Sequence, residues 1–138
     1  MRIVVLAGGY SPERDVSLSS GSLIANALIK LGHDVLLLDL YEGIETEEDN
    51  YSDLFKNNKI YEYKVSTDEP DLEELKRKNN NGNSLIGKNV LEICKYADIV
   101  FMALHGGIGE NGQIQAVFDA LRNQIYRQRL YWEFAGNG

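Results

Sequence analysis

Three short runs of uninterrupted apolar residues mark the framework of the chain. They cover residues 3–7, 35–38 and 99–104. Continuous apolar runs bounded by turn-forming residues are typical of strands that are buried on both faces, as in parallel sheets. We therefore predict three buried, parallel strands at these positions.

Apolar residues recur at helical spacing between and after these runs. The spacing predicts helices over residues 17–31, 86–97 and 114–121. Asp15 or Ser17 is the expected N-cap of the first helix. Strands that alternate with helices in this order predict an α/β fold, a Rossmann-like parallel sheet with helices on both faces.

The middle of the chain, residues 41–85, is polar and lacks a clear periodicity. The acidic run at 42–49 is expected to be a solvated loop. Weak alternation over 59–65 predicts a short strand, and the charged stretch 71–78 predicts a short helix. Residues 79–84 have the composition of a loop.

Composition narrows the class of protein. The chain has 138 residues, of which 43% are apolar, so it can form the core of one domain. The only cysteine, Cys94, cannot form an internal disulfide, which favours the reducing cytoplasm, and its place in a predicted helix favours a core position over a nucleophile. A net charge of -7 argues against nucleic acid, and no apolar run is long enough to cross a membrane. One cysteine and two histidines give no recognisable metal site.

The charge changes abruptly near the end of the chain. Residues 1–121 hold 11 basic and 20 acidic side chains, a net charge of -9, whereas residues 122–138 hold three arginines and one glutamate, a net charge of +2. This second segment also contains the only tryptophan. We therefore divide the chain into a domain over 1–121 and a basic, aromatic tail over 122–138.

Two glycine-rich loops follow predicted strands. The first covers residues 8–17 and includes Gly8 and Gly9, and the second covers residues 105–112 and includes Gly106 and Gly107. Ligands of open parallel sheets bind beyond the carboxyl ends of the strands, and glycines let backbone N–H groups approach them. The loops are therefore the expected binding site.

Charged side chains in these loops have two interpretations. Glu13 and Arg14 are suited to hold the two ends of an amino acid, but they can equally pair with each other or with neighbours on the surface.

His105, in the second loop, is either a ligand contact or a hydrogen-bond donor that shapes its own loop. Residues 107–112 match the dinucleotide pattern G-x-G-x-x-G, but they follow the third predicted strand rather than the first. A standalone module that binds an amino acid or a nucleotide therefore stays open.

The same loops carry two long motifs. V-V-L-A-G-G followed by S-P-E-R-D-V-S, and later F-M-A-L-H-G-G-I-G-E-N-G, resemble the two signatures of the N-terminal domain of D-alanine–D-alanine ligases. The resemblance covers residues 1–121. It implies a Rossmann-like domain that precedes an ATP-grasp core, in a cytoplasmic enzyme that joins two D-alanines with ATP and magnesium for peptidoglycan synthesis.

The resemblance also implies roles for individual residues. Glu13 matches the family glutamate that contacts the ammonium group of the first D-alanine, and His105 matches a histidine beside that substrate. Val16 and Ser17 match residues that shape the same end of the pocket. A carboxylate that recognises an ammonium through a charge-assisted hydrogen bond is chemically reasonable.

The family holds ATP and magnesium in segments that these 138 residues do not match. We therefore expect this chain alone to be inactive, with no catalytic residue, cofactor or metal of its own, and to bind D-alanine weakly at best. A second possibility is a dimerisation or regulatory fragment that pairs with an intact ligase.

The tail has a possible origin in the genetic code. Codons permitted for residues 122–138 can be chosen so that reading one base later gives G-I-K-Y-T-G-S-G-Y-I-G-S-L-L-A-M-D, which resembles the next segment of the family. We expect a one-base shift near Leu121. Tyr131, Trp132 and Phe134 remain compatible with a strand at the sheet edge, and an exposed edge favours a homodimer or a larger homo-oligomer.

Overall fold

The computed structural model describes residues 1–56, 60–65, 67–79, 84–104, 119 and, by their backbone alone, 129–132. Four parallel strands in the order β2-β1-β3-β4 form its sheet. They are β1 (Arg2–Ala7), β2 (Asp34–Asp39), β3 (Ile99–Met102) and β4 (Arg129–Trp132). The three strands predicted from the apolar runs are confirmed. The expected addition of the tail to the sheet edge is confirmed over β4.

The central strand β1 is buried on both faces. Val4, Val5 and Leu6 have no exposed surface. Because neighbouring side chains of a strand point to opposite faces, Val4 and Leu6 belong to one core cluster, and Ile3, Val5 and Ala7 belong to the other. This explains why the sequence shows a continuous apolar run instead of an alternating one.

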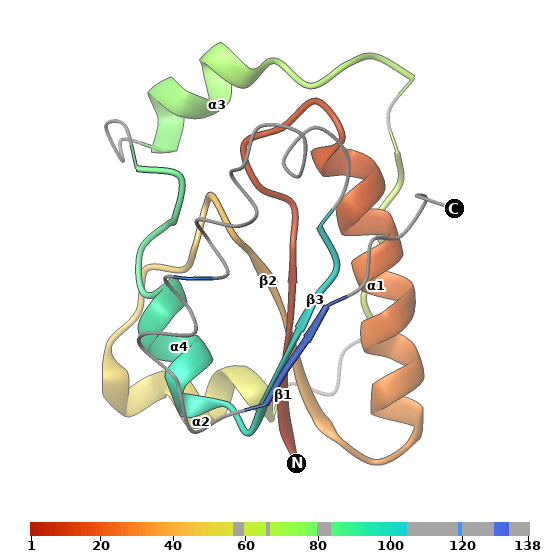
Figure 1. The fold of residues 1–138 in the computed structure, drawn as a ribbon, viewed down its shortest axis with the longest axis vertical. Helices are drawn as coiled ribbons and strands as arrows, with labels where there is room; N and C mark the ends of the chain where they lie inside the picture. The colour runs from red at the N-terminus through yellow and green to blue at the C-terminus, as the bar shows by residue number, and fades with distance from the viewer. Residues whose placement is uncertain (57–59, 66, 80–83, 105–118, 120–128, 133–138) are drawn as a thin grey trace.

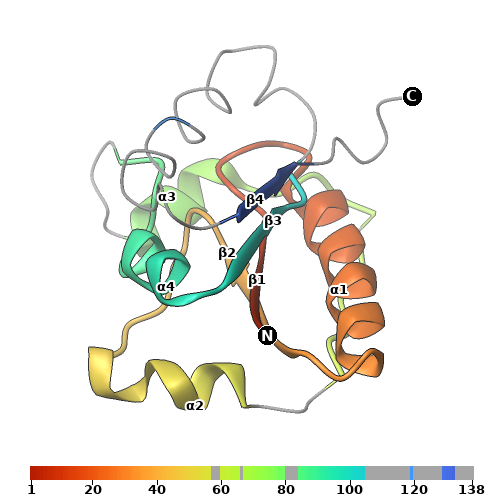
Figure 2. The same cartoon turned by 60° about the horizontal axis from the view of Figure 1, so that its bottom comes forward.

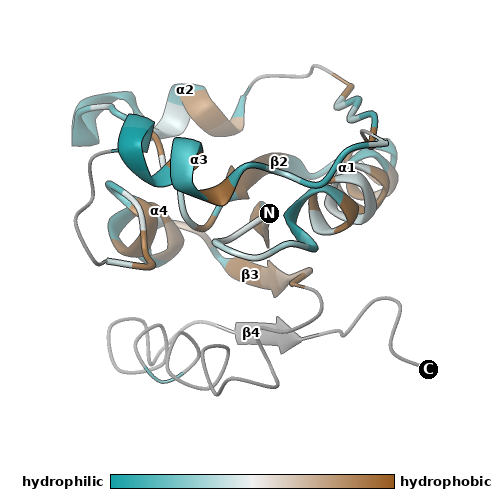
Figure 3. Ribbon diagram, turned by 90° about the horizontal axis from the view of Figure 1, so that it is seen from above, coloured by the Kyte–Doolittle hydropathy of each residue, from teal (hydrophilic) through white to brown (hydrophobic). Residues whose placement is uncertain are grey.

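Helices cover the two faces of the sheet separately. Helix α1 (Arg14–Lys30) packs on one face, and α2 (Tyr51–Phe55) and α4 (Val90–Tyr96) pack on the other (Figure 3). The short η1 (Glu48–Asn50) leads into α2, and α3 (Leu72–Asn79) lies at the periphery (Figures 1 and 2). The predicted α/β class, with a parallel sheet and helices on both faces, is confirmed.

The order of the strands reverses between β1 and β3. The chain leaves β1 through α1 to reach β2 on one side, and it then returns past β1 to form β3 on the other side. A reversal of this kind is a switch point, and open α/β sheets bind ligands at the carboxyl ends of the strands beside it.

The start of α1 differs from the prediction. The helix begins at Arg14, and neither Asp15 nor Ser17 caps it, because both lie inside the helix. Ser11 closes the turn before the helix instead. Its hydroxyl oxygen accepts a hydrogen bond from the Glu13 N–H (3.2 Å), and its carbonyl oxygen accepts one from the Arg14 N–H (3.0 Å).

The strand predicted over 59–65 is wrong for residues 60–65, which form no strand. Tyr61 lies against α1, where its N–H donates to Asn26 Oδ1 and its carbonyl accepts from Asn26 Nδ2, both at 2.8 Å. The amide side chain thus binds the backbone groups that a neighbouring strand would have bound.

Helices α3 and α4 lie where the sequence predicted them, but their first and last residues differ from the prediction. The predicted charged helix is α3, and the helix predicted over 86–97 begins only at Val90, because Asn89 has a left-handed backbone (φ 64°). The short α2 was not predicted. Of the helix expected over 114–121, Asp119 is helical and the rest lies outside the described residues.

Close packing of α1 on the sheet depends on Gly21. A Cβ atom at this position would lie 2.9 Å from the Ala7 Cβ and 3.0 Å from Leu37 Cδ1. The helix therefore approaches β1 and β2 more closely than a larger residue would allow.

We expect Gly21→Ala to lower the free energy of unfolding by about 1–3 kcal/mol, because overpacking outweighs the roughly 1 kcal/mol by which alanine favours a helix. Leu23→Ala is the control in the same helix, since Leu23 is 70% exposed, and its effect should stay within about 0.5 kcal/mol. Urea unfolding followed by circular dichroism measures both. A Gly21→Ala protein more stable than the wild type would contradict this packing.

Candidate functional site

The loop between β1 and α1 lies at the carboxyl ends of the strands, beside the switch point between β1 and β3. Gly8 and Gly9 have positive φ angles of 76° and 90°. A Cβ atom on Gly8 would lie 2.8 Å from the carboxyl group of Asp39. Both the backbone conformation and the lack of space therefore require glycine at position 8.

Glu13 lies at the N-cap position of α1 and is partly exposed. The Ser11 hydroxyl donates a hydrogen bond to Glu13 Oε2 at 2.7 Å. Among the described residues, no donor is bonded to the second oxygen, Oε1. A carboxylate held by one oxygen, with the other open, is suited to accept a hydrogen bond from a ligand's ammonium group.

Arg14 pairs with groups of the protein other than Glu13. Its side chain is 7% exposed and forms an ion pair with Asp39 at the end of β2. Its Nε donates to the Gly9 carbonyl at 3.2 Å, and its Nη2 lies 3.5 Å from Glu42 Oε1. Of the two interpretations of this arginine, the structure supports pairing within the protein.

Ser17 joins the two central strands where they end. Its hydroxyl accepts a hydrogen bond from the Gly8 N–H (2.9 Å) and donates one to the Ala103 carbonyl just beyond β3. Ser17 has no exposed surface. Both hydrogen bonds are made to backbone, so Ser17 shapes the site by joining the loop after β1 to the end of β3.

The other residues predicted for the site are placed as follows. Val16 lies one turn after Glu13 and is 44% exposed, so it can contact a ligand beside Glu13. His105, Gly106 and Gly107, with the rest of the second loop, lie outside the described residues. The structure thus brings together Gly8, Gly9, Glu13 and Ser17 at the carboxyl end of β1.

Sequence reasoning missed Asp39. Its Oδ1 accepts hydrogen bonds from the N–H groups of Tyr41 (2.9 Å), Gly9 (3.3 Å) and Glu42 (3.3 Å), and its Oδ2 pairs with Arg14. A signal was present, because an aspartate directly after a buried strand lies at the edge of the sheet where ligand loops meet.

Several other groups lie away from this site. Cys94 is fully buried in the core, and burial together with the nearby Glu92 raises the pKa of its thiol to about 12. The thiol is therefore unreactive, as its predicted core position implied. In the described part of the chain, no three metal-ligating side chains come together, and no helix has the length and apolar character that a membrane crossing needs.

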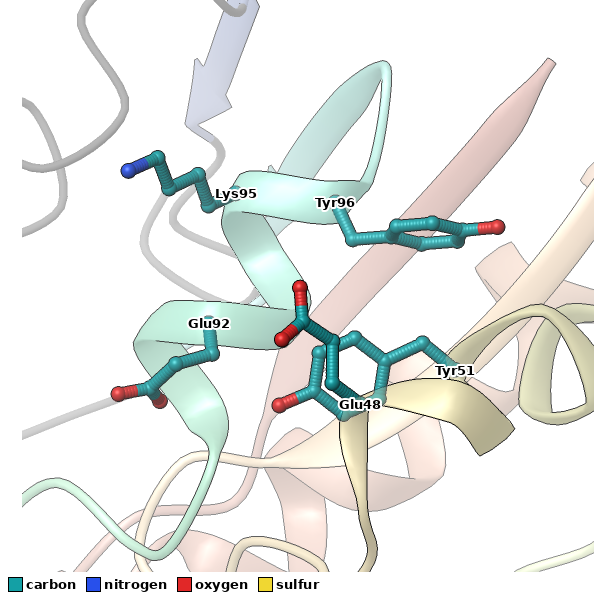
Figure 4. A pocket seen from close by; sticks show the side chains of 5 residues that line it. All are labelled: Glu48, Tyr51, Glu92, Lys95 and Tyr96. Atoms are coloured by element: carbon teal, nitrogen blue, oxygen red, sulfur yellow. The ribbon is translucent and has the colours of Figure 1, made fainter.

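A separate cavity of about 380 Å³ lies between η1, α2 and α4. Glu48, Tyr51, Glu92, Lys95 and Tyr96 line it (Figure 4). Tyr96 also contacts the guanidinium of Arg2 at the start of β1, 4.2 Å from the ring centroid. The cavity therefore lies near the amino ends of the strands, opposite the loops that contain Gly8 and Glu13.

Comparison with known proteins decides the family. The family profile described as "D-ala D-ala ligase N-terminus" matches residues 2–125. The chain belongs to this family. It is 52% identical over 124 residues to the D-alanine–D-alanine ligase of Pediococcus pentosaceus and 48% identical over 124 residues to that of Lacticaseibacillus casei. It is also 34% identical over 121 residues to the D-alanine–D-alanine ligase of Halalkalibacterium halodurans.

These alignments define how much of a ligase the chain represents. Each covers 86–88% of this chain but only 25–35% of the relative. The chain thus spans about a third of the length of its more similar ligase relatives. Among the described residues, no group of three metal-ligating side chains lies where it could hold a magnesium ion.

The Ser17 contacts in this ligase domain lead to a stability prediction. Ser17→Ala leaves both the Gly8 N–H and the Ala103 carbonyl without this partner, and we expect it to cost about 1–3 kcal/mol of unfolding free energy. Ser22→Ala is the matched control. Ser22 is also buried in α1, but its hydroxyl donates only to the Leu18 carbonyl, so its loss should cost about 0.5–1 kcal/mol. Equal losses in urea unfolding would contradict the account.

Proposed function

We propose that this chain supplies the side of a D-alanine–D-alanine ligase active site that binds the ammonium end of the first D-alanine. The observation that carries the proposal is the position of Glu13. Its carboxylate stands at the switch point of a ligase-family domain, with Oε2 fixed by Ser11 and Oε1 bonded to no donor of the described residues. Val16 would contact the same ligand, and His105 would approach it from the second loop.

The proposal is tested by titrating the 138-residue chain with D-alanine and following its amide signals by NMR. We expect saturable shifts at Gly8 and Gly9 with a dissociation constant on the order of millimolar, because only one side of a pocket is present. Glu13→Gln should weaken binding about tenfold or more, since a charge-assisted hydrogen bond is worth about 1.5–3 kcal/mol.

Two controls make this titration specific. Glu73→Gln changes an exposed glutamate on α3, far along the chain from the site, and it should bind D-alanine as the wild type does. L-alanine tests stereochemistry and should bind more weakly. Equal binding of both alanines, or an affinity that does not depend on Glu13, would overturn the proposal.

By themselves, these 138 residues are proposed not to catalyse ligation. They match only about a third of the length of the more similar ligases, whereas phosphoryl transfer needs metal ions and cationic groups around the phosphates. We therefore expect no D-alanine-dependent release of ADP in a coupled assay at saturating ATP. Turnover at a rate typical of enzymes, on the order of 1 s⁻¹ or above, would show that the chain is a complete catalyst.

A nucleotide-binding module is the second candidate. Only the pattern over residues 107–112 favours it, and this stretch lies outside the described residues. Calorimetry separates the two, because ATP binding without D-alanine binding would favour the nucleotide module. Copurification with a full-length ligase would instead favour a regulatory fragment.

The homo-oligomer remains a proposal for the same chain. Strand β4 pairs with β3 along one edge and, among the described strands, has no partner on its other edge. An unpaired edge is a template for association. We expect light scattering at high protein concentration to give the mass of a dimer or a larger assembly, and a monomer throughout would refute this.

The shifted reading frame of residues 122–138 also remains a proposal, together with a cytoplasmic location. The family profile ends at residue 125, close to the proposed shift near Leu121. Sequencing the gene tests it directly. A ligase sequence that continues downstream in the same frame would contradict the shift.

A further inference from the structure

The network that surrounds Asp39 suggests a role for a residue that makes no contact with a ligand. Asp39 ends β2, whereas the candidate site lies on the loop after β1. Oδ1 of Asp39 accepts from the Gly9 N–H at 3.3 Å, so the carboxylate reaches across from one strand end to the neighbouring loop. The N–H groups of Tyr41 and Glu42 bind the same oxygen and fix its position.

Arg14 completes the connection from the helix side. Its Nη2 pairs with Asp39 Oδ2, and its Nε donates to the Gly9 carbonyl at 3.2 Å. The N–H and the C=O of Gly9 are therefore held by the two members of one ion pair. Arg14 directly follows Glu13 in the chain, so the pair also fixes the start of α1.

The pair is rigidly enclosed. The Arg14 side chain is 7% exposed and the Asp39 side chain is 13% exposed. Gly8 packs so closely on the carboxyl group that a Cβ atom there would lie 2.8 Å from it. Loss of Asp39 would leave the buried Arg14 guanidinium with the half-exposed Glu42 carboxylate, 3.5 Å from Nη2, as its ion-pair partner among the described residues, which is unfavourable. The loop can therefore leave this position only if the pair separates.

We propose that Asp39 is the positioning residue of the candidate D-alanine site: through Arg14 and Gly9 it holds the loop that presents Glu13. The expected effect of Asp39 on D-alanine binding rests on the proposed function. The hold of Asp39 on the loop does not depend on any ligand. The charge of Asp39 is the essential feature, because an amide of the same shape cannot balance the guanidinium.

The test compares Asp39→Asn with Asp34→Asn, a change of the same residue type at the exposed start of the same strand. We expect hydrogen exchange at the Gly9 amide to accelerate at least tenfold in Asp39→Asn and to stay unchanged in Asp34→Asn. The amides of Val4, Val5 and Leu6 should keep their protection in both variants, which separates loss of loop position from general unfolding.

D-alanine titration of the same variants gives the second readout. The dissociation constant should rise about tenfold or more in Asp39→Asn and should not change in Asp34→Asn. Arg14→Gln provides an independent variant if Asp39→Asn does not fold, because it leaves the three backbone bonds to Asp39 in place. It should weaken D-alanine binding to a similar extent. In the double variant the two effects should not add, since both remove the same pair.

The outcomes separate this inference from the proposed function. A wild-type chain that does not bind D-alanine, with faster Gly9 exchange in Asp39→Asn, would refute the proposed function and support the hold of Asp39 on the loop. Unchanged Gly9 exchange in Asp39→Asn would overturn the inference even if the wild type binds D-alanine. Faster exchange with unchanged D-alanine affinity would also overturn it, because the loop position would then not matter to the ligand.

Discussion

The pairing of β1 on both of its edges is the constraint on which the rest of the structure depends. Its backbone bonds in parallel to β2 over residues 2–7 and to β3 over residues 3–6. Because β1 is bonded on both edges and covered on both faces, all of its side chains face the interior of the protein. Apolar residues therefore fill the strand and form a core cluster on each side of it. The same pairing produces the switch point at its carboxyl end.

Polar contacts at the carboxyl end of β1 hold the loops of the candidate site in place. Ser17 connects the ends of β1 and β3, and Arg14 with Asp39 connects the β1 loop to the end of β2. All of these contacts involve the first turn of α1 or the loop before it. A helix placed by the buried Arg14 and Ser17 side chains and the partly buried Asp39 leaves Glu13 little freedom to move, although Glu13 itself is partly exposed.

The sequence predicted the parts of the fold that rest on local patterns. Continuous apolar runs located the strands, and helical spacing located α1, because both patterns follow directly from burial. It did not predict where α1 begins, since the decisive contact comes from the Ser11 side chain and backbone rather than from a residue in the first turn. The strand predicted over residues 60–65 is also wrong. The backbone of Tyr61 bonds to the side chain of Asn26, which is distant in sequence, instead of to a strand.

The candidate site itself stays a prediction, and the structure decides only how its residues are arranged. The motifs pointed to the loop after β1 and to Glu13, whereas the sequence left Arg14 either to hold a ligand or to pair within the protein. Its partner Asp39 lies 25 residues away, and only the register between β1 and β2 brings the two together. The place of Asp39 after an apolar run marks it as a residue at the sheet edge, but a long-range ion pair leaves no pattern in a single sequence, so its pairing with Arg14 could be found only from the folded chain.

The most direct measurement of the central claim is a crystal structure of the chain grown with D-alanine. The account predicts a D-alanine at the switch point between β1 and β3, with its ammonium nitrogen about 2.7–2.9 Å from Glu13 Oε1. Val16 should lie beside its methyl group. A D-alanine bound only elsewhere, such as in the cavity between η1 and α4, would contradict the account.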